Sequence, residues 1–279
     1  MGAERIIGKK FPLEERTILL TQTEYQIKKI EKLLHLEKAI PISIPCIEPK
    51  LILSDQEMIK LLAKIEKYDW IIFTSQNAFL LYEEFLKKNN LQQQLHAIKI
   101  ATVGHETRET IEQAGYQIAF TPQIPKTSKE FFDQWMQEVD LKGKTVLFPR
   151  SKRSISQIPE NLVQLGTVIV PIEFYDVLPH ENVASYYQAL ASIEVDWLLF
   201  SSPTAVNSFF SMRPNDEEVR HWIFSSGVKI ATIGSSTSKA LAEKNVPISC
   251  ESPNPSTRWM IETIKAFEKL ENWDVGEEE

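Results

Sequence analysis

The chain has 279 residues, of which 43% are hydrophobic and 25% are charged, and this length suits about two domains of ~100–150 residues. The formal net charge of −7 argues against general nucleic-acid binding, which needs a basic face. No apolar run approaches the ~18 residues of a membrane-spanning helix, and the N-terminal residues lack the apolar core of a signal peptide. We therefore expect a cytoplasmic protein that binds neither nucleic acid nor membranes.

Short apolar runs alternate along the chain with stretches of helical periodicity. We expect strands at 17–20, 42–44, 70–73, 98–103, 116–120, 145–148, 168–170, 172–177, 197–200, 230–233 and 248–250. Helices are expected near 27–34, 58–65, 79–82, 131–136, 162–165, 186–190 and 259–267, and after Gly104, Pro203 and Gly234. Capping boxes that begin at Ser54 and Thr127 mark two helix starts. The alternation predicts an α/β fold with parallel sheets that are covered by helices.

Two segments of the chain repeat each other. Residues 69–79 (DWIIFTSQNAF) are echoed by 196–206 (DWLLFSSPTAV), and 99–107 (KIATVGHET) are echoed by 229–237 (KIATIGSST). Such a repeat is a duplicated domain and not a short solenoid unit. In each copy an apolar strand runs into hydroxyl, amide or glycine residues before a helix, as at the carboxyl ends of strands in α/β domains. We therefore expect two domains that face each other across a ligand cleft.

The polar residues at these strand ends are candidate binding residues. They are Thr74, Ser75, Asn77, Gly104, His105 and Thr107 in the first copy, and Ser201, Ser202, Gly234, Ser235, Ser236 and Thr237 in the second. The free N–H groups of a first helical turn, with a threonine hydroxyl beside them, suit a carboxylate or phosphate. A purely structural role is also open, because glycine permits the turn and a hydroxyl residue caps the helix. The repetition of the pattern favours binding.

Two later strand ends add further candidates. Arg150 and Ser151 follow the strand at 145–148, within a stretch (121–170) that is locally slightly basic. Tyr175 lies on an extended segment where the chain crosses back. A tyrosine there is either a packed aromatic residue or a neutral acid, because its unperturbed pKa is near 10.

Several chemistries are disfavoured by missing motifs. Neither Gly104 nor Gly234 belongs to a Gly-x-Gly-x-x-Gly fingerprint, and no phosphate-binding loop lysine is present. The isolated Cys46 and Cys250 form no zinc-ligand pattern and fit a reducing compartment. The scattered histidines show no Ser/His/Asp or Cys/His arrangement, so covalent hydrolysis is not expected. His105 has no counterpart in the second copy and is more consistent with a residue that lines the cleft than with a base.

The order and spacing of these motifs resemble those of the uroporphyrinogen-III synthase family. The matching segments are 69–78 (DWIIFTSQNA), 103–107 (VGHET), 147–150 (LFPR), 170–175 (VPIEFY), 196–203 (DWLLFSSP), 230–241 (IATIGSSTSKAL) and 251–255 (ESPNP). The resemblance covers roughly residues 17–267. One departure is Ser235-Ser236, where a Pro-Thr pair is common in the family.

The resemblance implies a fold and an activity. The family has two similar flavodoxin- or Rossmann-like domains with parallel sheets, joined by a two-stranded connector, and one domain is discontinuous. Here the discontinuous domain would comprise 1–47 with 178–279, and the inserted domain 48–177. The family closes hydroxymethylbilane into uroporphyrinogen III with inversion of ring D and loss of water, and it uses no metal or organic cofactor. Its tyrosine before the crossover matches Tyr175, and its cleft threonines match Thr107 and Thr237.

The resemblance also implies a cytoplasmic monomer that makes, at most, transient contact with the enzyme that supplies the bilane. Two other functions stay open from the residues alone. One is a non-catalytic two-domain binder or sensor of a small polyanion, which would share the cleft. The other is a sugar-transferring enzyme with two α/β domains, for which the chain is short and lacks a nucleotide-sugar signature.

Overall fold

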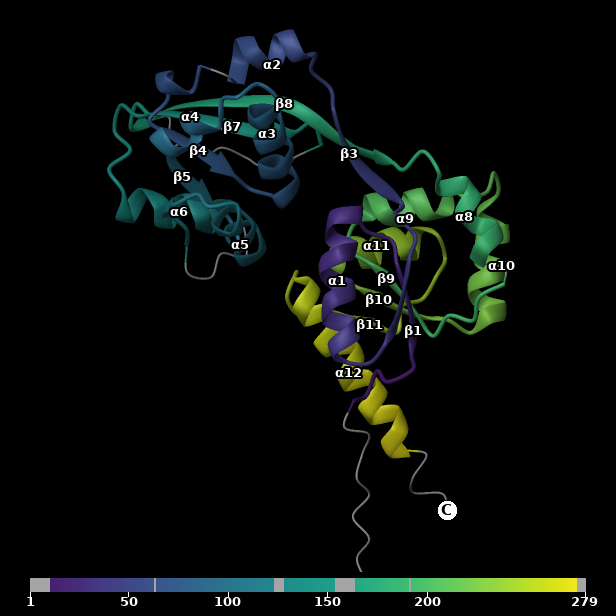
Figure 1. Ribbon diagram of the computed structural model, residues 1–279. Helices are drawn as coiled ribbons and strands as arrows, with labels where there is room; N and C mark the ends of the chain where they lie inside the picture. The colour runs from purple at the N-terminus through teal and green to yellow at the C-terminus, as the bar shows by residue number, and fades with distance from the viewer. Residues whose placement is uncertain (1–10, 63, 123–127, 154–163, 191, 275–279) are drawn as a thin grey trace, which may run out of the picture. The chain divides into compact units, whose positions relative to one another are not determined.

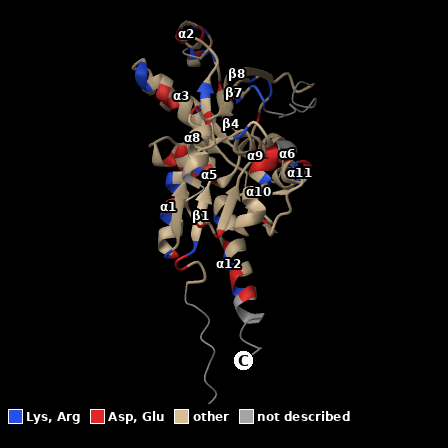
Figure 2. Ribbon diagram, turned by 90° about the vertical axis from the view of Figure 1, so that its right-hand side faces the viewer, with Lys and Arg blue, Asp and Glu red and all other residues tan. Residues whose placement is uncertain are grey.

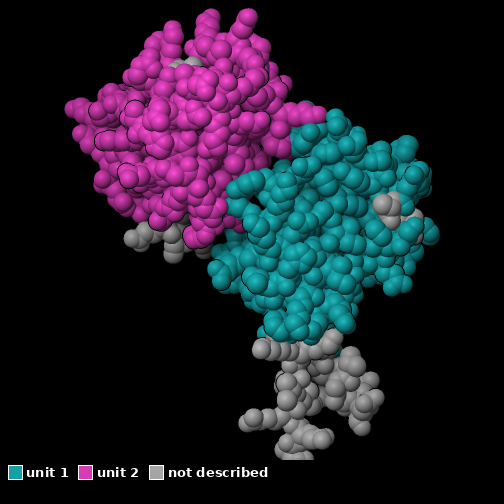
Figure 3. All heavy atoms as spheres, in the orientation of Figure 1, with its two compact units in different colours: residues 1–48, 178–279 teal, residues 49–177 magenta. Residues whose placement is uncertain are grey.

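The computed structural model describes residues 11–62, 64–122, 128–153, 164–190 and 192–274. Contacts within the chain divide it into two compact units (Figure 3). Unit 1 comprises Met1–Glu48 with Leu178–Glu279, and unit 2 comprises Pro49–Val177. In the described part of the chain, no helix has the length and apolar character needed to cross a membrane.

Unit 1 is built on a five-stranded sheet whose strand order is β11-β10-β9-β1-β2, with parallel pairing throughout (Figure 1). The strands are β1 Thr17–Leu20, β2 Ile40–Ser43, β9 Trp197–Phe200, β10 Lys229–Thr232 and β11 Cys250–Glu251. The helices are α1 Glu24–Leu36, α8 Val183–Leu190, α9 Pro203–Phe210, α10 Asp216–Ser226, α11 Ser235–Glu243 and α12 Thr257–Asp274. The helices α1 and α12 contact each other and bury Ile30, Leu34, Met260 and Ile264 in one core with β1 and β9.

Unit 2 contains a sheet with the order β3-β8-β7-β4-β5-β6. Its strands are β3 Ile47–Leu51, β4 Trp70–Phe73, β5 Lys99–Thr102, β6 Ile118–Phe120, β7 Thr145–Ser151 and β8 Val168–Pro179. Its helices are α2 Asp55–Leu62, a 3-10 turn at Ile65–Lys67, α3 Gln76–Lys88, α4 Gln92–Ala97, α5 His105–Gln113 and α6 Ser128–Glu138. Ile71 and Phe73 belong to one core cluster, whereas Trp70 and Ile72 belong to another. Because successive strand residues point to opposite faces, the sheet is covered on both sides.

The two sheets have the same strand order once the chain is permuted. Read from the other side, unit 2 runs β6-β5-β4-β7-β8-β3, and its first five strands correspond one for one to β11-β10-β9-β1-β2 of unit 1. The register also agrees, because Trp70 lies opposite Lys99 and Trp197 opposite Lys229. The duplication read from the sequence is therefore a duplication of sheet topology.

The repeated Asp-Trp pair has a structural role in both units. The Asp69 carboxylate accepts the backbone N–H of Thr145 at 2.9 Å and the Lys144 ammonium at 3.0 Å. The Asp196 carboxylate accepts the N–H of Thr17 at 2.7 Å and the Arg16 guanidinium at 2.9 Å. Each aspartate thus binds the first residue of the neighbouring central strand, at the amino ends of the strands. These aspartates stabilise strand pairing at the edge opposite to the candidate site.

The predicted α/β fold with parallel sheets is confirmed. β3, α4 and α10 were not among the elements expected from the sequence, and the other differences lie at element boundaries. The runs 168–170 and 172–177, expected as separate strands, form the single strand β8, because the exposed Pro171 sits in the ladder without interrupting it. The strand expected at 248–250 is shifted to Cys250–Glu251, and the strand expected from 116 begins at Ile118 after Gly115, whose φ is +90°. Thr127, where one capping box was expected to begin, and residues 162–163 of the helix expected at 162–165 lie outside the described residues.

Candidate functional site

Ser75 and Ser202 both cap the helix that follows their strand. The Ser75 hydroxyl accepts the Ala78 N–H at 3.1 Å, and the Ser202 hydroxyl accepts the Ala205 N–H at 3.1 Å. Both serines have extended backbones, as N-cap residues do. Capping therefore accounts for one hydroxyl in each copy, and the neighbouring polar residues Thr74, Asn77 and Ser201 are half-buried and not needed for it.

Gly104 and Gly234 precede helices that no side chain caps. Gly104 is the N-cap of α5 and has a φ of +80°, which strains any residue with a Cβ atom. Gly234 is the N-cap of α11 and has an extended φ of 164°. Among the described residues, no side chain caps either helix start by accepting a hydrogen bond, so first-turn N–H groups are left for a ligand or water.

Thr107 and Thr237 occupy equivalent positions in the first turns of α5 and α11. They are 5% and 0% exposed, and neither acts as the N-cap, so the structural alternative in which the threonine caps its helix is wrong. The Thr237 hydroxyl oxygen is buried and has no hydrogen-bond partner among the described residues. A buried polar group without a partner costs free energy, so Thr237 is the candidate that packing alone explains least.

The other candidate residues of these two turns, His105, Ser235 and Ser236, are exposed. His105 presents 77% of its side chain to solvent and lies 3.5 Å from Glu109, one helical turn away. Ser235 and Ser236 are exposed at the start of α11. All three are accessible to a ligand at the helix N-termini.

β7 runs on to Ser151, so Arg150 and Ser151 lie at the end of the strand and do not follow it as expected, and Arg150 already has an acidic partner. Its guanidinium lies 3.0 Å from the Glu173 carboxylate on β8, and 18% of its side chain is exposed. The Arg150 Nε atom is buried and has no partner among the described residues. Ser151 pairs with Tyr175 in the ladder between β7 and β8.

Tyr175 is buried, with 4% of its surface exposed, and its hydroxyl lies 2.9 Å from the Ser75 hydroxyl. Its ring packs edge-on against Phe174 at 5.1 Å. Burial raises the pKa of Tyr175, and the Asp176 charge adds to this effect, whereas the bond to Ser75 opposes it. The net shift is upward, so the phenol is protonated throughout the neutral pH range.

Sequence reasoning missed two buried glutamines at the strand ends. Gln76 donates its amide N–H to the Glu106 carbonyl at 3.0 Å and to the Thr110 hydroxyl at 2.9 Å, which ties α3 to α5. Gln22 follows β1 and donates to the Leu199 carbonyl at 3.2 Å, while its own amide oxygen is buried without a partner in the described chain. The signal for Gln22 was its place in the polar run Thr21–Thr23 after a buried strand.

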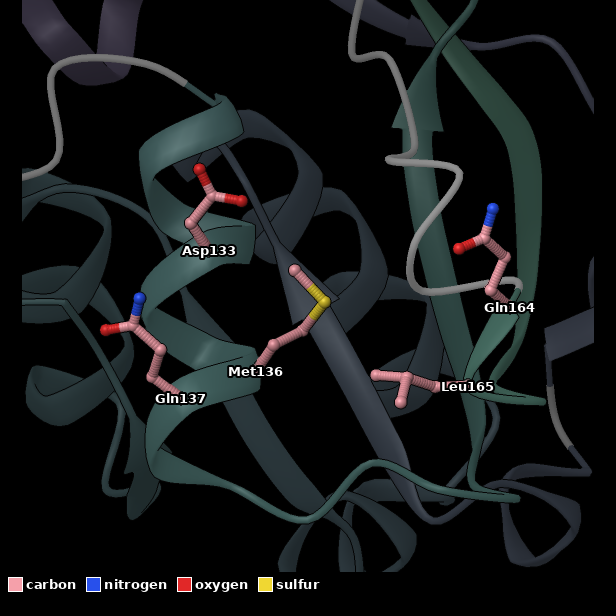
Figure 4. Close-up of a pocket in the computed structure, with 5 residues that line it drawn as sticks. All are labelled: Asp133, Met136, Gln137, Gln164 and Leu165. Atoms are coloured by element: carbon pink, nitrogen blue, oxygen red, sulfur yellow. The ribbon is translucent and has the colours of Figure 1, made fainter.

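An open hollow of about 460 Å³ lies in unit 2 between α6 and residues 164–165 (Figure 4). Its lining residues are Asp133, Met136, Gln137, Gln164 and Leu165. None of the predicted site residues lines this hollow. Over the described residues, no cluster of three or more His, Cys, Asp or Glu side chains has an arrangement that could hold a metal ion.

Comparisons with known proteins cover most of the chain. The family model described as "Uroporphyrinogen-III synthase HemD" matches residues 28–262. A protein of Chlorobaculum parvum named uroporphyrinogen-III synthase is 27% identical over 84% of this chain and 91% of its own. A protein of Synechococcus elongatus with the same name is 26% identical over 81% of this chain and 86% of its own.

Two solved structures have a similar fold. A uroporphyrinogen-III synthetase of Helicobacter pylori superposes with a TM-score of 0.59 and 18% identity, over 89% of this chain and 97% of its own. A mutant uroporphyrinogen III synthase of Thermus thermophilus superposes with a TM-score of 0.53 and 17% identity, over 92% of this chain and 99% of its own.

Proposed function

The chain belongs to the uroporphyrinogen-III synthase family, and from this premise we propose that it cyclises hydroxymethylbilane to uroporphyrinogen III, with inversion of ring D and loss of water. In class terms it is a cyclising lyase. We also propose that it acts as a cytoplasmic monomer without a cofactor, and that units 1 and 2 are the two domains of the family, with β3 and β8 as the connector.

The chemistry of the strand ends supports a polycarboxylate substrate. Uncapped helix N-termini at Gly104 and Gly234 offer N–H groups and a favourable dipole to carboxylates. The exposed Ser235 and Ser236 add hydroxyl donors, and Arg150 offers a guanidinium that pairs well with carboxylates. We propose that these groups, with Thr107 and Thr237, hold the acidic side chains of the bilane.

The single observation that carries the catalytic proposal is the position of the buried Tyr175 hydroxyl, which lies 2.9 Å from the Ser75 hydroxyl. Ring closure begins when the hydroxyl group of the bilane leaves as water, which requires a proton on the leaving oxygen. Tyr175 donates that proton, directly or through a water molecule, and the C–O electron pair departs with the oxygen. The Ser75 hydroxyl then stabilises the phenolate, because it can donate a hydrogen bond to it while still accepting the Ala78 N–H.

The resulting azafulvene is intrinsically reactive, so the larger task of the protein is geometric. The substituted carbon of ring D must attack and give a spiro intermediate, in preference to the free carbon that gives the non-inverted isomer. Fixing the bilane through its carboxylates can contribute several kcal/mol to this choice, without any strong acid. The preference for isomer III over isomer I then depends on all the groups that bind the carboxylates together.

The direct test supplies hydroxymethylbilane to the purified protein and separates the oxidised products by isomer. We expect isomer III from the wild-type protein, at a rate above spontaneous closure. If isomer I is the only product although the bilane binds, the protein is a binder of the polyanion and the enzymatic proposal is wrong.

The Tyr175→Phe variant tests the proton donor. It removes only the hydroxyl, so the packing against Phe174 is retained. We expect single-turnover conversion to slow by about 100-fold or less, at the low end of general-acid effects because water is an alternative donor, while product binding is unchanged. An unchanged rate at every pH would make Tyr175 a packing residue.

A further inference from the structure

The segment that carries Tyr175 leaves regular strand geometry just before that residue. Arg150 lies opposite Glu173, whereas the next residue, Ser151, lies opposite Tyr175. β8 therefore holds one extra residue, Phe174, and such a β-bulge redirects the side chains around it. Phe174, Tyr175 and Asp176 are all buried beside this bulge, whereas Glu173 just before them is exposed.

Each of these three residues is held by a different partner. The Phe174 carbonyl accepts the Ile52 N–H at 2.9 Å, and the Tyr175 carbonyl accepts the Lys152 N–H at 2.9 Å. The Asp176 carboxylate accepts the Arg153 guanidinium Nε–H, which lies 3.0 Å from one of its oxygens and 3.2 Å from the other. Of these three contacts, only the last joins two side chains, so only it can be removed by substitution without altering the backbone.

The ion pair is asymmetric in its exposure. Only 10% of the Asp176 side chain is exposed, whereas 57% of the Arg153 side chain is exposed. A buried carboxylate needs its partners to offset the lost hydration, and Asp176 obtains them from Arg153 and from the Val177 N–H at 2.8 Å. The buried Asp176 carboxylate therefore sets the position of the ion pair, and the Arg153 guanidinium binds it at residue 176 of β8.

We propose that the Arg153–Asp176 ion pair is a positioning device for Tyr175: it fixes the end of β8 after the bulge, so that the phenol is held at the Ser75 hydroxyl. This inference deepens the proposed function and rests on the catalytic role given there to Tyr175. Neither Arg153 nor Asp176 contacts the substrate in this scheme, and both act through the orientation of the Tyr175 ring.

The first test reads the position of Tyr175 without any substrate. The protein is labelled with ¹³Cζ-tyrosine, and the Tyr175 resonance is assigned by its loss in Tyr175→Phe. We expect Asp176→Asn and Arg153→Gln to shift this resonance and Arg153→Lys to restore it in part. The control is Glu112→Gln, which removes an exposed ion pair to the Nε of Arg108 at 2.9 Å in the same unit. A Tyr175 resonance that moves no more than in the control overturns the inference.

The second test is a double-mutant cycle on the rate of isomer III formation. We expect Asp176→Asn to lower the rate by about 3- to 10-fold in the wild-type background, within the coupling range of neighbouring residues. In the Tyr175→Phe background the same substitution should have no further effect, because the hydroxyl it positions is absent. Equal losses in both backgrounds would show a general structural role and overturn the inference.

The two proposals fail in distinguishable ways. If the wild-type protein makes no isomer III, the proposed function fails, while the resonance experiment still decides whether the ion pair positions Tyr175. If isomer III forms and Asp176→Asn changes neither the rate nor the resonance, only the positioning role fails.

Discussion

Glu268 on α12 is a buried acid, and its replacement should lower the free energy of unfolding by an amount that is easily measured. Its side chain is 0% exposed, and its carboxylate lies 2.7 Å from the Arg16 guanidinium, 2.8 Å from the Lys229 ammonium and 2.9 Å from the Trp197 indole nitrogen. These partners come from the segment before β1, from β9 and from β10, so one carboxylate joins the C-terminal helix to three parts of unit 1. Acidic and basic residues are interspersed along α12 (Figure 2).

The structure sets the size of the expected loss for Glu268→Gln. Removing one partner of a buried ion pair costs ~3–5 kcal/mol. Both cations keep a second acidic partner, since Arg16 also binds Asp196 and Lys229 also binds Glu271, so we expect the lower end, ~3 kcal/mol. For a unit of this size that corresponds to a fall in melting temperature of ~6–12 °C.

The matched control is Glu271→Gln, because Glu271 binds the same Lys229 from the same helix but has 47% of its side chain exposed. An exposed ion pair contributes ~0–1 kcal/mol to the free energy of unfolding, so Glu271→Gln should change the stability very little. The assay is urea unfolding followed by tryptophan fluorescence, with calorimetry for the melting temperature. Equal losses in the two variants would refute the argument that burial decides the magnitude.

The same variant should change the response to acid. Burial alone would raise the pKa of Glu268, but the hydrogen bonds from Lys229 and Trp197 and the charges of Lys229 and Arg16 outweigh it, so the net shift is downward. A carboxyl with a lowered folded-state pKa stabilises the protein above its unfolded pKa of ~4.3, and this contribution is lost as the pH falls through the folded value. Glu268→Gln should therefore flatten the fall of stability below pH ~4.3.

Two further predictions concern stability and reactivity. Asp69→Asn and Asp196→Asn should each lower the free energy of unfolding by ~1 kcal/mol, because each variant loses a charged hydrogen-bond acceptor that is partly exposed. Urea unfolding measures this loss. If only one of the two variants is destabilised, the two aspartates are not equivalent. Burial raises the pKa of the Cys46 thiol, and it raises the pKa of the Cys250 thiol to about 11. Both thiols should therefore react slowly with a disulfide reagent at neutral pH. Fast labelling of Cys46 in the native protein would contradict this.

Features that depend on local sequence were predictable. The duplicated strand ends, the capping role of Ser202 before Pro203 and the capping box at Ser54 follow from patterns over a few residues, and the structure has them. The bond from Tyr175 to Ser75 joins residues 100 positions apart, so no local pattern encodes it. The register of β8 shifts by one residue just before Tyr175, and such a shift, which reverses the faces to which side chains point, is not visible in a local pattern.

The position of β1 has a consequence for biosynthesis. β1 is formed by residues 17–20, yet it lies between β2 and β9, and β9 begins at Trp197. As the ribosome makes the chain, unit 2 is complete once residue 177 has emerged, whereas β1 must wait for 197–200 before its second side is paired. Pairing at such long sequence separation is slow and leaves strand edges open to other chains. The sheet of unit 1 is therefore incomplete while unit 2 folds. We expect the nascent chain to depend most on chaperones during that interval.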